Sequence, residues 1–193
     1  MTVNLSKGGN ISLSKEAPGL THAVVGLGWD PRVTDGAKFD LDASAILCGA
    51  DGKAVSDEHF VFYNNTKDPS GAVQHQGDNR DGSGEGDDEM VFVSLVDLPA
   101  AVEKIVFVVS IDEAEARDQN FGQVANAYIR VLDANNPDSP ITKYDLGEDF
   151  STERSVKFGE IYRHNGDWKF RAVGQGYSAG LAGIIAEYGL MAS

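Results

Sequence analysis

The sequence has little cysteine, little positive charge and no long apolar run. Its single cysteine, Cys48, cannot form an intrachain disulfide, which suits a reducing compartment. Sixteen Lys and Arg residues stand against 30 Asp and Glu residues, a formal net charge of −14. This balance disfavours binding to nucleic acid or anionic lipid and favours cations or basic partners. No run approaches the roughly 20 apolar residues of a membrane span, and the first ten residues lack an apolar signal core. We therefore expect a soluble, cytoplasmic protein.

Familiar catalytic motifs are also missing. The sequence contains no G-x-x-x-x-G-K-[ST] phosphate loop and no visible Ser-His-Asp or Cys-His arrangement. Its four histidines show no metal-ligand spacing, and His75, three residues before a strongly acidic segment, is expected to be exposed. No general base or phosphate-binding group is therefore evident.

Short apolar, β-branched runs separated by turn signals fill most of the 193 residues, which we interpret as one domain, 1–193. Two short runs lie within residues 2–14, and Asn165-Gly166 predicts a hairpin turn inside 155–174. The other runs are 22–29, 39–47, 59–63, 90–96, 104–111, 127–132 and 141–146. Because strands do not alternate with helices, we predict an all-β protein, a mostly antiparallel β-sandwich.

Two segments favour helix instead. Residues 112–118 are polar and rich in helix formers. Residues 178–190 predict a C-terminal helix that Ser178 can cap and Gly189 can end. Its apolar residues fall at helical spacing on one face: Leu181, Ile184, Ile185 and Tyr188. The predicted fold is therefore a β-sandwich with short helical segments and one terminal helix.

The most unusual stretch is residues 78–89, in which six of twelve residues are acidic and three are glycine. Carboxylates crowded this closely repel one another unless a hard cation binds them, and Ca²⁺ takes about six to eight oxygen ligands. Arg80 and Gly82 stand where an EF-hand needs ligands, and Ser83 stands where it needs glycine, so this is not an EF-hand. We predict a calcium-binding loop between strands; the alternative is a solvated surface loop.

Three more carboxylates lie near predicted strand ends. Asp40 and Asp42 share one face of the strand 39–47, and Asp30 directly follows the strand that ends at Trp29. Alternate strand ends meet at one edge of an antiparallel sandwich, so these three acids and residues 78–89 can converge there, and Asp112 can join them. The alternative for Asp40 and Asp42 is a solvated sheet face.

Several stretches, taken in chain order, resemble the TerD-domain family. They are 5–13 (LSKGGNISL) with 17–20 (APGL), 28–30 (GWD), 40–44 (DLDAS), 62–65 (FYNN), 77–89 and 119–124 (QNFGQV), which together span essentially the whole chain. The resemblance implies a cytoplasmic calcium-binding β-sandwich tied to resistance to tellurite and other stresses, with no established enzymatic activity. It also implies metal ligands at Asp30, Asp40, Asp42, Asp78, Asp87, Asp88 and Glu89, with Asn79, Gly82 and Gly84 contributing backbone carbonyls.

The number and placement of these acids predict two calcium ions. Seven carboxylates exceed what one Ca²⁺ usually takes, and the adjacent Asp87 and Asp88 should point to opposite sides of an extended chain. We interpret the protein as a calcium-responsive binding or scaffold module, and the resemblance implies other proteins of the tellurite-resistance system as partners. The alternative is a metal-dependent enzyme acting on phosphate esters through the same acids, which would need an open metal position and a general base.

Overall fold

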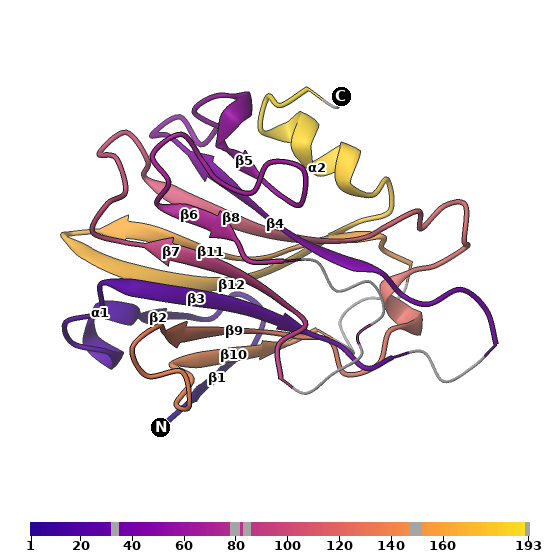
Figure 1. The fold of residues 1–193 in the computed structure, drawn as a ribbon, viewed down its shortest axis with the longest axis horizontal. Helices are drawn as coiled ribbons and strands as arrows, with labels where there is room; N and C mark the ends of the chain where they lie inside the picture. Colours follow the sequence, from indigo (N-terminus) through magenta and orange to yellow (C-terminus); the bar gives the residue numbers. More distant parts are fainter. Residues whose placement is uncertain (32–34, 78–81, 83–85, 147–151, 192–193) are drawn as a thin grey trace.

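Two six-stranded sheets pack face to face in the computed structural model, which describes residues 1–31, 35–77, 82, 86–146 and 152–191 (Figure 1). Sheet A has the order β1 (Val3–Leu5), β10 (Thr142–Asp145), β9 (Tyr128–Asp133), β3 (His22–Gly28), β7 (Glu89–Ser94) and β6 (Val73–His75). Sheet B has the order β2 (Asn10–Ser12), β12 (Asp167–Tyr177), β11 (Ser155–His164), β8 (Lys104–Ile111), β4 (Leu41–Cys48) and β5 (Phe60–Val61). Within the described chain, β1 and β10 form the single parallel pair, so the predicted mostly antiparallel sandwich is confirmed.

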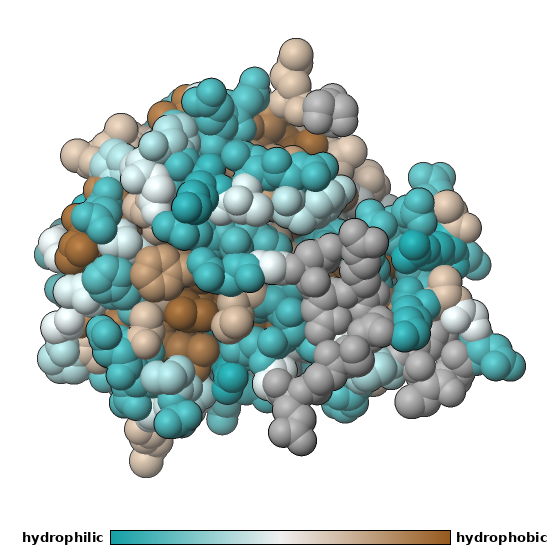
Figure 2. All heavy atoms as spheres, viewed as in Figure 1, coloured by the Kyte–Doolittle hydropathy of each residue, from teal (hydrophilic) through white to brown (hydrophobic). Residues whose placement is uncertain are grey.

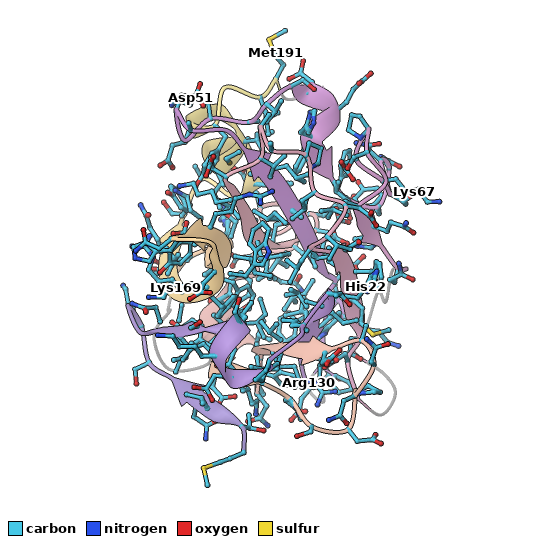
Figure 3. The ribbon with its side chains drawn as sticks, turned by 90° about the vertical axis from the view of Figure 1, so that its left-hand side faces the viewer. His22, Asp51, Lys67, Arg130, Lys169 and Met191 are labelled. Atoms are coloured by element: carbon cyan, nitrogen blue, oxygen red, sulfur yellow. The ribbon has the colours of Figure 1, made fainter. Side chains whose placement is uncertain are left out.

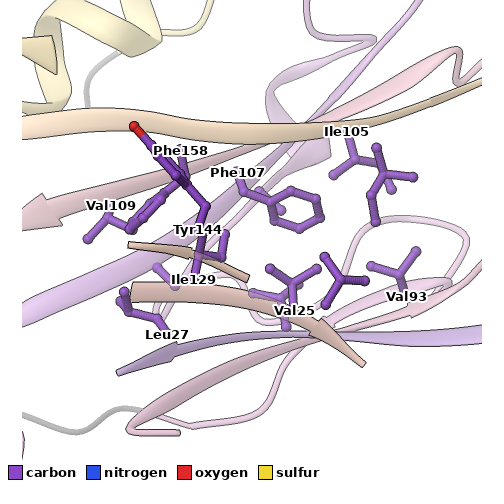
Figure 4. Close-up of a cluster of buried hydrophobic side chains, with 14 of the residues drawn as sticks. Val25, Leu27, Val93, Ile105, Phe107, Val109, Ile129, Tyr144 and Phe158 are labelled. Atoms are coloured by element: carbon purple, nitrogen blue, oxygen red, sulfur yellow. The ribbon is translucent and has the colours of Figure 1, made fainter. Parts of the chain in front are cut away.

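The core lies between the two sheets, where alternate residues of each strand point inward. Sheet A contributes Val25, Leu27 and Val93, and sheet B contributes Ile105 and Phe107, all at most 4% exposed (Figure 4). Strand β8 is buried on its other face as well, because the C-terminal helix α2 (Leu181–Glu187) packs there. This double burial explains its continuous β-branched sequence, KIVFVVSI.

Some short elements differ from the sequence prediction. The two strands before residue 14 do not pair with each other: β1 joins sheet A and β2 joins sheet B. Strand β6 was not predicted, because its three residues include a glutamine and a histidine. Residues 112–118 form turns rather than a helix, since Glu113 and Asp118 have positive φ values of 49° and 51° that interrupt right-handed helix.

The hairpin and the C-terminal helix were predicted more closely. Asn165 and Gly166 both have positive φ, as the hairpin turn between β11 and β12 requires. Helix α2 begins after Gly180 rather than Ser178 and ends at Glu187, and the Leu190 N–H closes it on the Ile185 carbonyl at 3.1 Å. Among the residues that the structure describes, the other helical segments are α1 (Leu13–Glu16) and two 3₁₀ turns, Asp57–His59 and Phe121–Gln123.

The outer faces of the two sheets have different surroundings. Helix α2 covers part of sheet B, where Cys48 and Val106 lie beneath Ile184. Sheet A presents its outer face to the viewer in Figure 2, with apolar side chains over β3 and β7, where Val24 and Phe92 are half-buried. In the described part of the chain no helix is both long enough and apolar enough to cross a membrane.

Candidate metal centre

Several predicted site segments meet at Trp29, which follows β3 and is 4% exposed. Its backbone N–H donates to Asp88 Oδ2 at 2.9 Å, and its indole Nε1–H donates to the Phe39 carbonyl at 3.2 Å. Gly82 packs against the indole, since a Cβ there would lie 2.4 Å from Nε1. Trp29 thus connects the end of β3 to Phe39, the residue before Asp40, and to Gly82 and Asp88 of the segment 78–89.

Asp40 and Asp42 line one cavity of about 490 Å³, together with Asp112 and Glu113. The Asp112 N–H donates to the Asp40 carbonyl at 2.8 Å, which extends the β4–β8 ladder and holds these two residues opposite each other. Asp42 lies on the outer face of sheet B and is 8% exposed. The remaining lining residues are Ala37, Lys38, Tyr63 and Arg117.

The carboxylates of this cavity suit a hard cation. Asp40, Asp42 and Asp112 offer oxygen donors only, the ligand type that Ca²⁺ and Mg²⁺ prefer. No three Asp, Glu, His or Cys side chains among the described residues are arranged to hold a metal ion by themselves. The predicted ligands Asp78, Asn79 and Gly84 lie outside the described residues.

Asp87 lies on the outer face of sheet A, over Gly26, and its side chain is 3% exposed. Its carboxylate accepts the Arg130 Nε–H at 2.8 Å and 3.0 Å, and its Oδ1 also accepts the Tyr128 hydroxyl at 3.0 Å. Burial and the neighbouring Asp87 charge raise the pKa of Tyr128 to about 12, so its hydroxyl stays a donor. Asp87 is therefore held by a cation and a phenol of β9.

Glu89 points to the opposite side, between the sheets, and is 2% exposed. Its Oε2 accepts the Ala43 N–H of sheet B at 2.5 Å and lies 3.5 Å from His75 Nε2. The Gly77 N–H donates to His75 Nδ1 at 3.3 Å, which leaves the proton on Nε2, facing Glu89. The expectation that His75 is exposed was wrong: it is 7% exposed, because β6 pairs with β7 and turns His75 inward.

Asp30 is exposed and lies apart from the Asp40–Asp42 cavity. Its Oδ2 accepts the Asn126 side-chain amide at 2.5 Å. It lines a different cavity of about 860 Å³, together with Tyr128, Lys143 and Asp145. The described candidate ligands thus lie in five places. Asp40 and Asp42 line one cavity and Asp30 another, Gly82 and Asp88 contact Trp29, Asp87 lies on the outer face of sheet A, and Glu89 lies between the sheets.

Sequence reasoning missed the partners of these acids. Tyr128 and Arg130 alternate on β9 and so share its outer face, an observable signal. Because the chain is so acidic, an arginine in the middle of a strand suggests that its partner is an acid. Identifying that acid as Asp87 requires the register of β9 against β3. Figure 3 labels Arg130 and His22 of sheet A on the right of the view and Lys169 of sheet B on the left.

Comparison with known proteins gives an independent result. A model of the TerD domain matches residues 1–188. The chain is 56% identical to tellurium resistance protein TerD of Serratia marcescens over 193 residues, 100% of both chains. It is 52% identical to general stress protein 16U of Bacillus subtilis (strain 168) over 191 residues, 98% of both chains. A solved homologue of telluride resistance protein (TerD) from Streptomyces coelicolor A3(2) matches with a TM-score of 0.72 over 86% of this chain and 96% of that one; at 23% identity, it shows the fold alone.

Proposed function

The chain belongs to the TerD domain family, and from that premise we propose that it is a calcium-binding protein of the bacterial tellurium-resistance and stress-response system. Its similarity to a tellurium resistance protein and to a general stress protein over nearly their whole lengths supports this role. In this proposal the protein is a calcium-responsive binding or scaffold module of the cytoplasm. Its partners are other proteins of the same resistance system.

The observation that carries the proposal is the pair Asp40 and Asp42 at one cavity, beside Asp112. In the proposal these carboxylates would hold a calcium ion together with oxygen donors of the segment 78–89, of which Gly82 and Asp88 contact Trp29. A bound calcium ion supplies positive charge that offsets the repulsion among these acids. The chain's part is to fix the backbone at the strand ends, through the β4–β8 ladder and the Trp29 contacts.

The division of the candidate acids supports a second ion. Asp30 lines a cavity separate from that of Asp40 and Asp42, although Trp29, its neighbour in sequence, contacts both Gly82 and Asp88. In the proposal the predicted ligands Asp78, Asn79 and Gly84 complete the two sites. Calcium bound at these two strand ends then changes the charge of the surface offered to a partner.

We propose binding rather than catalysis. The residues that line the Asp40–Asp42 cavity in the described structure include no histidine. Its two cationic residues are Lys38 and Arg117, and Arg117 is paired with Glu113 at 2.7 Å. A metal-dependent phosphate esterase would need a general base and a free cationic group near the substrate. Metal-dependent hydrolysis of a phosphate ester that disappears in Asp42→Asn would favour the enzyme instead.

The test is the effect of calcium on thermal stability in Asp40→Asn and Asp42→Asn. At calcium concentrations about 100 times the dissociation constant, each site should stabilise the native protein by roughly 2.7 kcal/mol. Both variants should lose about half of the calcium-dependent rise in melting temperature, the contribution of one of the two proposed sites, while the calcium-free protein stays folded. Asp138→Asn is the matched control: it removes the same charge from the exposed β9–β10 turn, at the opposite end of sheet A.

A calcium-dependent rise that is unchanged in Asp42→Asn would exclude this cavity as the site. In a bacterium whose tellurite resistance depends on this chain, Asp42→Asn should also lower resistance, whereas Asp138→Asn should not. Full resistance with a protein that no longer binds calcium would separate the binding from the biological role.

A further inference from the structure

We propose that Asp87 is a positioning residue rather than a calcium ligand. Paired with Arg130, it anchors the end of the acidic segment on the outer face of sheet A and thereby sets the calcium affinity. The inference rests on the proposed calcium function but changes its ligand set, in which the sequence had placed Asp87 among the metal-binding acids.

The contacts of Asp87 leave little capacity for a metal. Both carboxylate oxygens accept the Arg130 Nε–H, and Oδ1 also accepts the Tyr128 hydroxyl. Gly26 closes the space beneath, since a Cβ there would overlap the carboxylate. A calcium ion bound to Asp87 would have to displace these charge-assisted hydrogen bonds or lie within a few ångströms of the Arg130 charge.

The side chains of three consecutive acids, residues 87–89, point in three directions. Asp87 contacts Arg130 on the outer face of sheet A, Asp88 accepts the Trp29 N–H, and Glu89 accepts the Ala43 N–H between the sheets. The backbone bends at Asp88, whose own N–H donates to the Leu27 carbonyl at 2.8 Å. The end of the acidic segment is therefore held on both faces of sheet A.

The platform that holds Asp87 also contacts the residue before it. The Tyr128 hydroxyl lies 3.2 Å from the Gly86 carbonyl as well as 3.0 Å from Asp87 Oδ1. Arg130 and Tyr128 come from the same face of β9, a strand between β10 and β3. A platform of this kind holds Gly86 and Asp87 in one position, and such preorganisation favours calcium binding.

The sign of one substitution separates positioning from direct ligation. Arg130→Gln removes a positive charge near a cation site, which by charge alone should strengthen calcium binding. If Arg130 instead acts by holding Asp87, the same substitution should weaken binding. Loss of a residue that supports metal ligands typically costs roughly 10- to 100-fold in affinity.

The experiment measures calcium dissociation constants by calorimetry for the wild type, Asp87→Asn, Arg130→Gln and the double variant. We expect each single variant to weaken binding by roughly 10-fold or more, and the double variant to be no weaker than the worse single variant, because one unit is lost in all three. Lys67→Gln is the matched control: it removes an exposed positive charge beside β6, at the edge of sheet A remote from β9. Its affinity should stay equal or rise slightly.

Two results would overturn the proposal. If Arg130→Gln leaves or improves the affinity while Asp87→Asn weakens it, Asp87 is a ligand. If both variants lower the melting temperature equally with and without calcium, the pair is structural only. A wild type that binds no calcium would refute the proposed function instead. The positioning role of Asp87 has a separate test: amide exchange at residues 86–88 should be faster in both calcium-free single variants than in the wild type. Unchanged exchange would refute that role.

Discussion

At the scale of single residues, Trp29 organises the candidate site. It ends one strand, contacts Gly82 through its ring, and binds Asp88 and Phe39 through its two N–H groups. A buried indole with its N–H satisfied is a rigid contact surface. The positions of the acids around it therefore depend on packing as much as on charge.

Gly82→Ala tests that packing. Its φ of 71° is a left-handed conformation that costs alanine about 1 kcal/mol, and a Cβ would lie 2.4 Å from Trp29 Nε1. We expect Gly82→Ala to lower the free energy of unfolding by about 1–3 kcal/mol through overpacking, measured by urea denaturation in saturating calcium. Gly86→Ala is the control, because Gly86 also has positive φ, 92°, but open space around its Cβ position. Equal losses in the two variants would show that the Trp29 contact is loose.

The sequence predicted the shared face of Asp40 and Asp42 but not the contacts of the other acids. The two-residue period of a strand correctly placed Asp40 and Asp42 on one face, because that period is a local property. The same reasoning could not reveal that Asp87 meets Arg130, that Glu89 reaches Ala43, or that His75 is buried. Each of those contacts depends on register between strands distant in sequence, which no local pattern records.

At the scale of elements, helix α2 is fastened to sheet B at its C-terminal end. The Lys157 Nζ lies 2.9 Å from Glu187 Oε1 and 4.8 Å from the centre of the Tyr188 ring. Burial alone would lower the pKa of Lys157, but hydrogen bonds to Tyr177, Glu187 and Tyr188 raise it overall, so it remains charged. The apolar side of the helix meanwhile covers Cys48, whose pKa burial raises to about 11.

The single cysteine makes opening of α2 measurable. Native Cys48 is buried and protonated near pH 8, so its reaction with a thiol reagent should be slow. Ile184→Ala removes a side chain that packs over it, which typically costs about 2 kcal/mol or more and should raise the labelling rate about 30-fold. Ile161→Ala, buried between the sheets, is the control and should leave the rate unchanged. Equal acceleration in both variants would mean that Cys48 reacts only after global unfolding.

Prediction of the elements succeeded where burial repeats along the chain. Strand β8, buried on both faces, and the hairpin at Asn165-Gly166 carry strong local signals. The three-residue β6 carries too few residues to show a period, and it forms because β7 presents an open edge. The predicted strand 59–63 is present as the shorter β5, Phe60–Val61. Residues 112–118 have good helix propensity, but in the turn after β8 Glu113 and Asp118 adopt positive φ values, which a right-handed helix does not allow.

At the scale of the whole molecule, the sequence predicted the sandwich but not the strand order. Short strands with turns between them indicate two sheets, whereas the assignment of β1 and β2 to opposite sheets follows from long-range pairing with β10 and β12. With a net charge of −14, the chain gains most from a cation where its acids meet. The proposed calcium binding at the Trp29 end of the sandwich would link the composition of the chain to the geometry of its strand ends.

Isothermal titration of chelator-treated protein with calcium tests that link most directly. We expect two calcium ions per chain, with the loss of one in Asp42→Asn. Millimolar Mg²⁺ should compete weakly, because loops that supply many oxygens suit Ca²⁺ better than the strict octahedral shell of Mg²⁺. Absence of binding, or a calcium stoichiometry and affinity that Asp42→Asn leaves unchanged, would contradict calcium binding at this end of the sandwich.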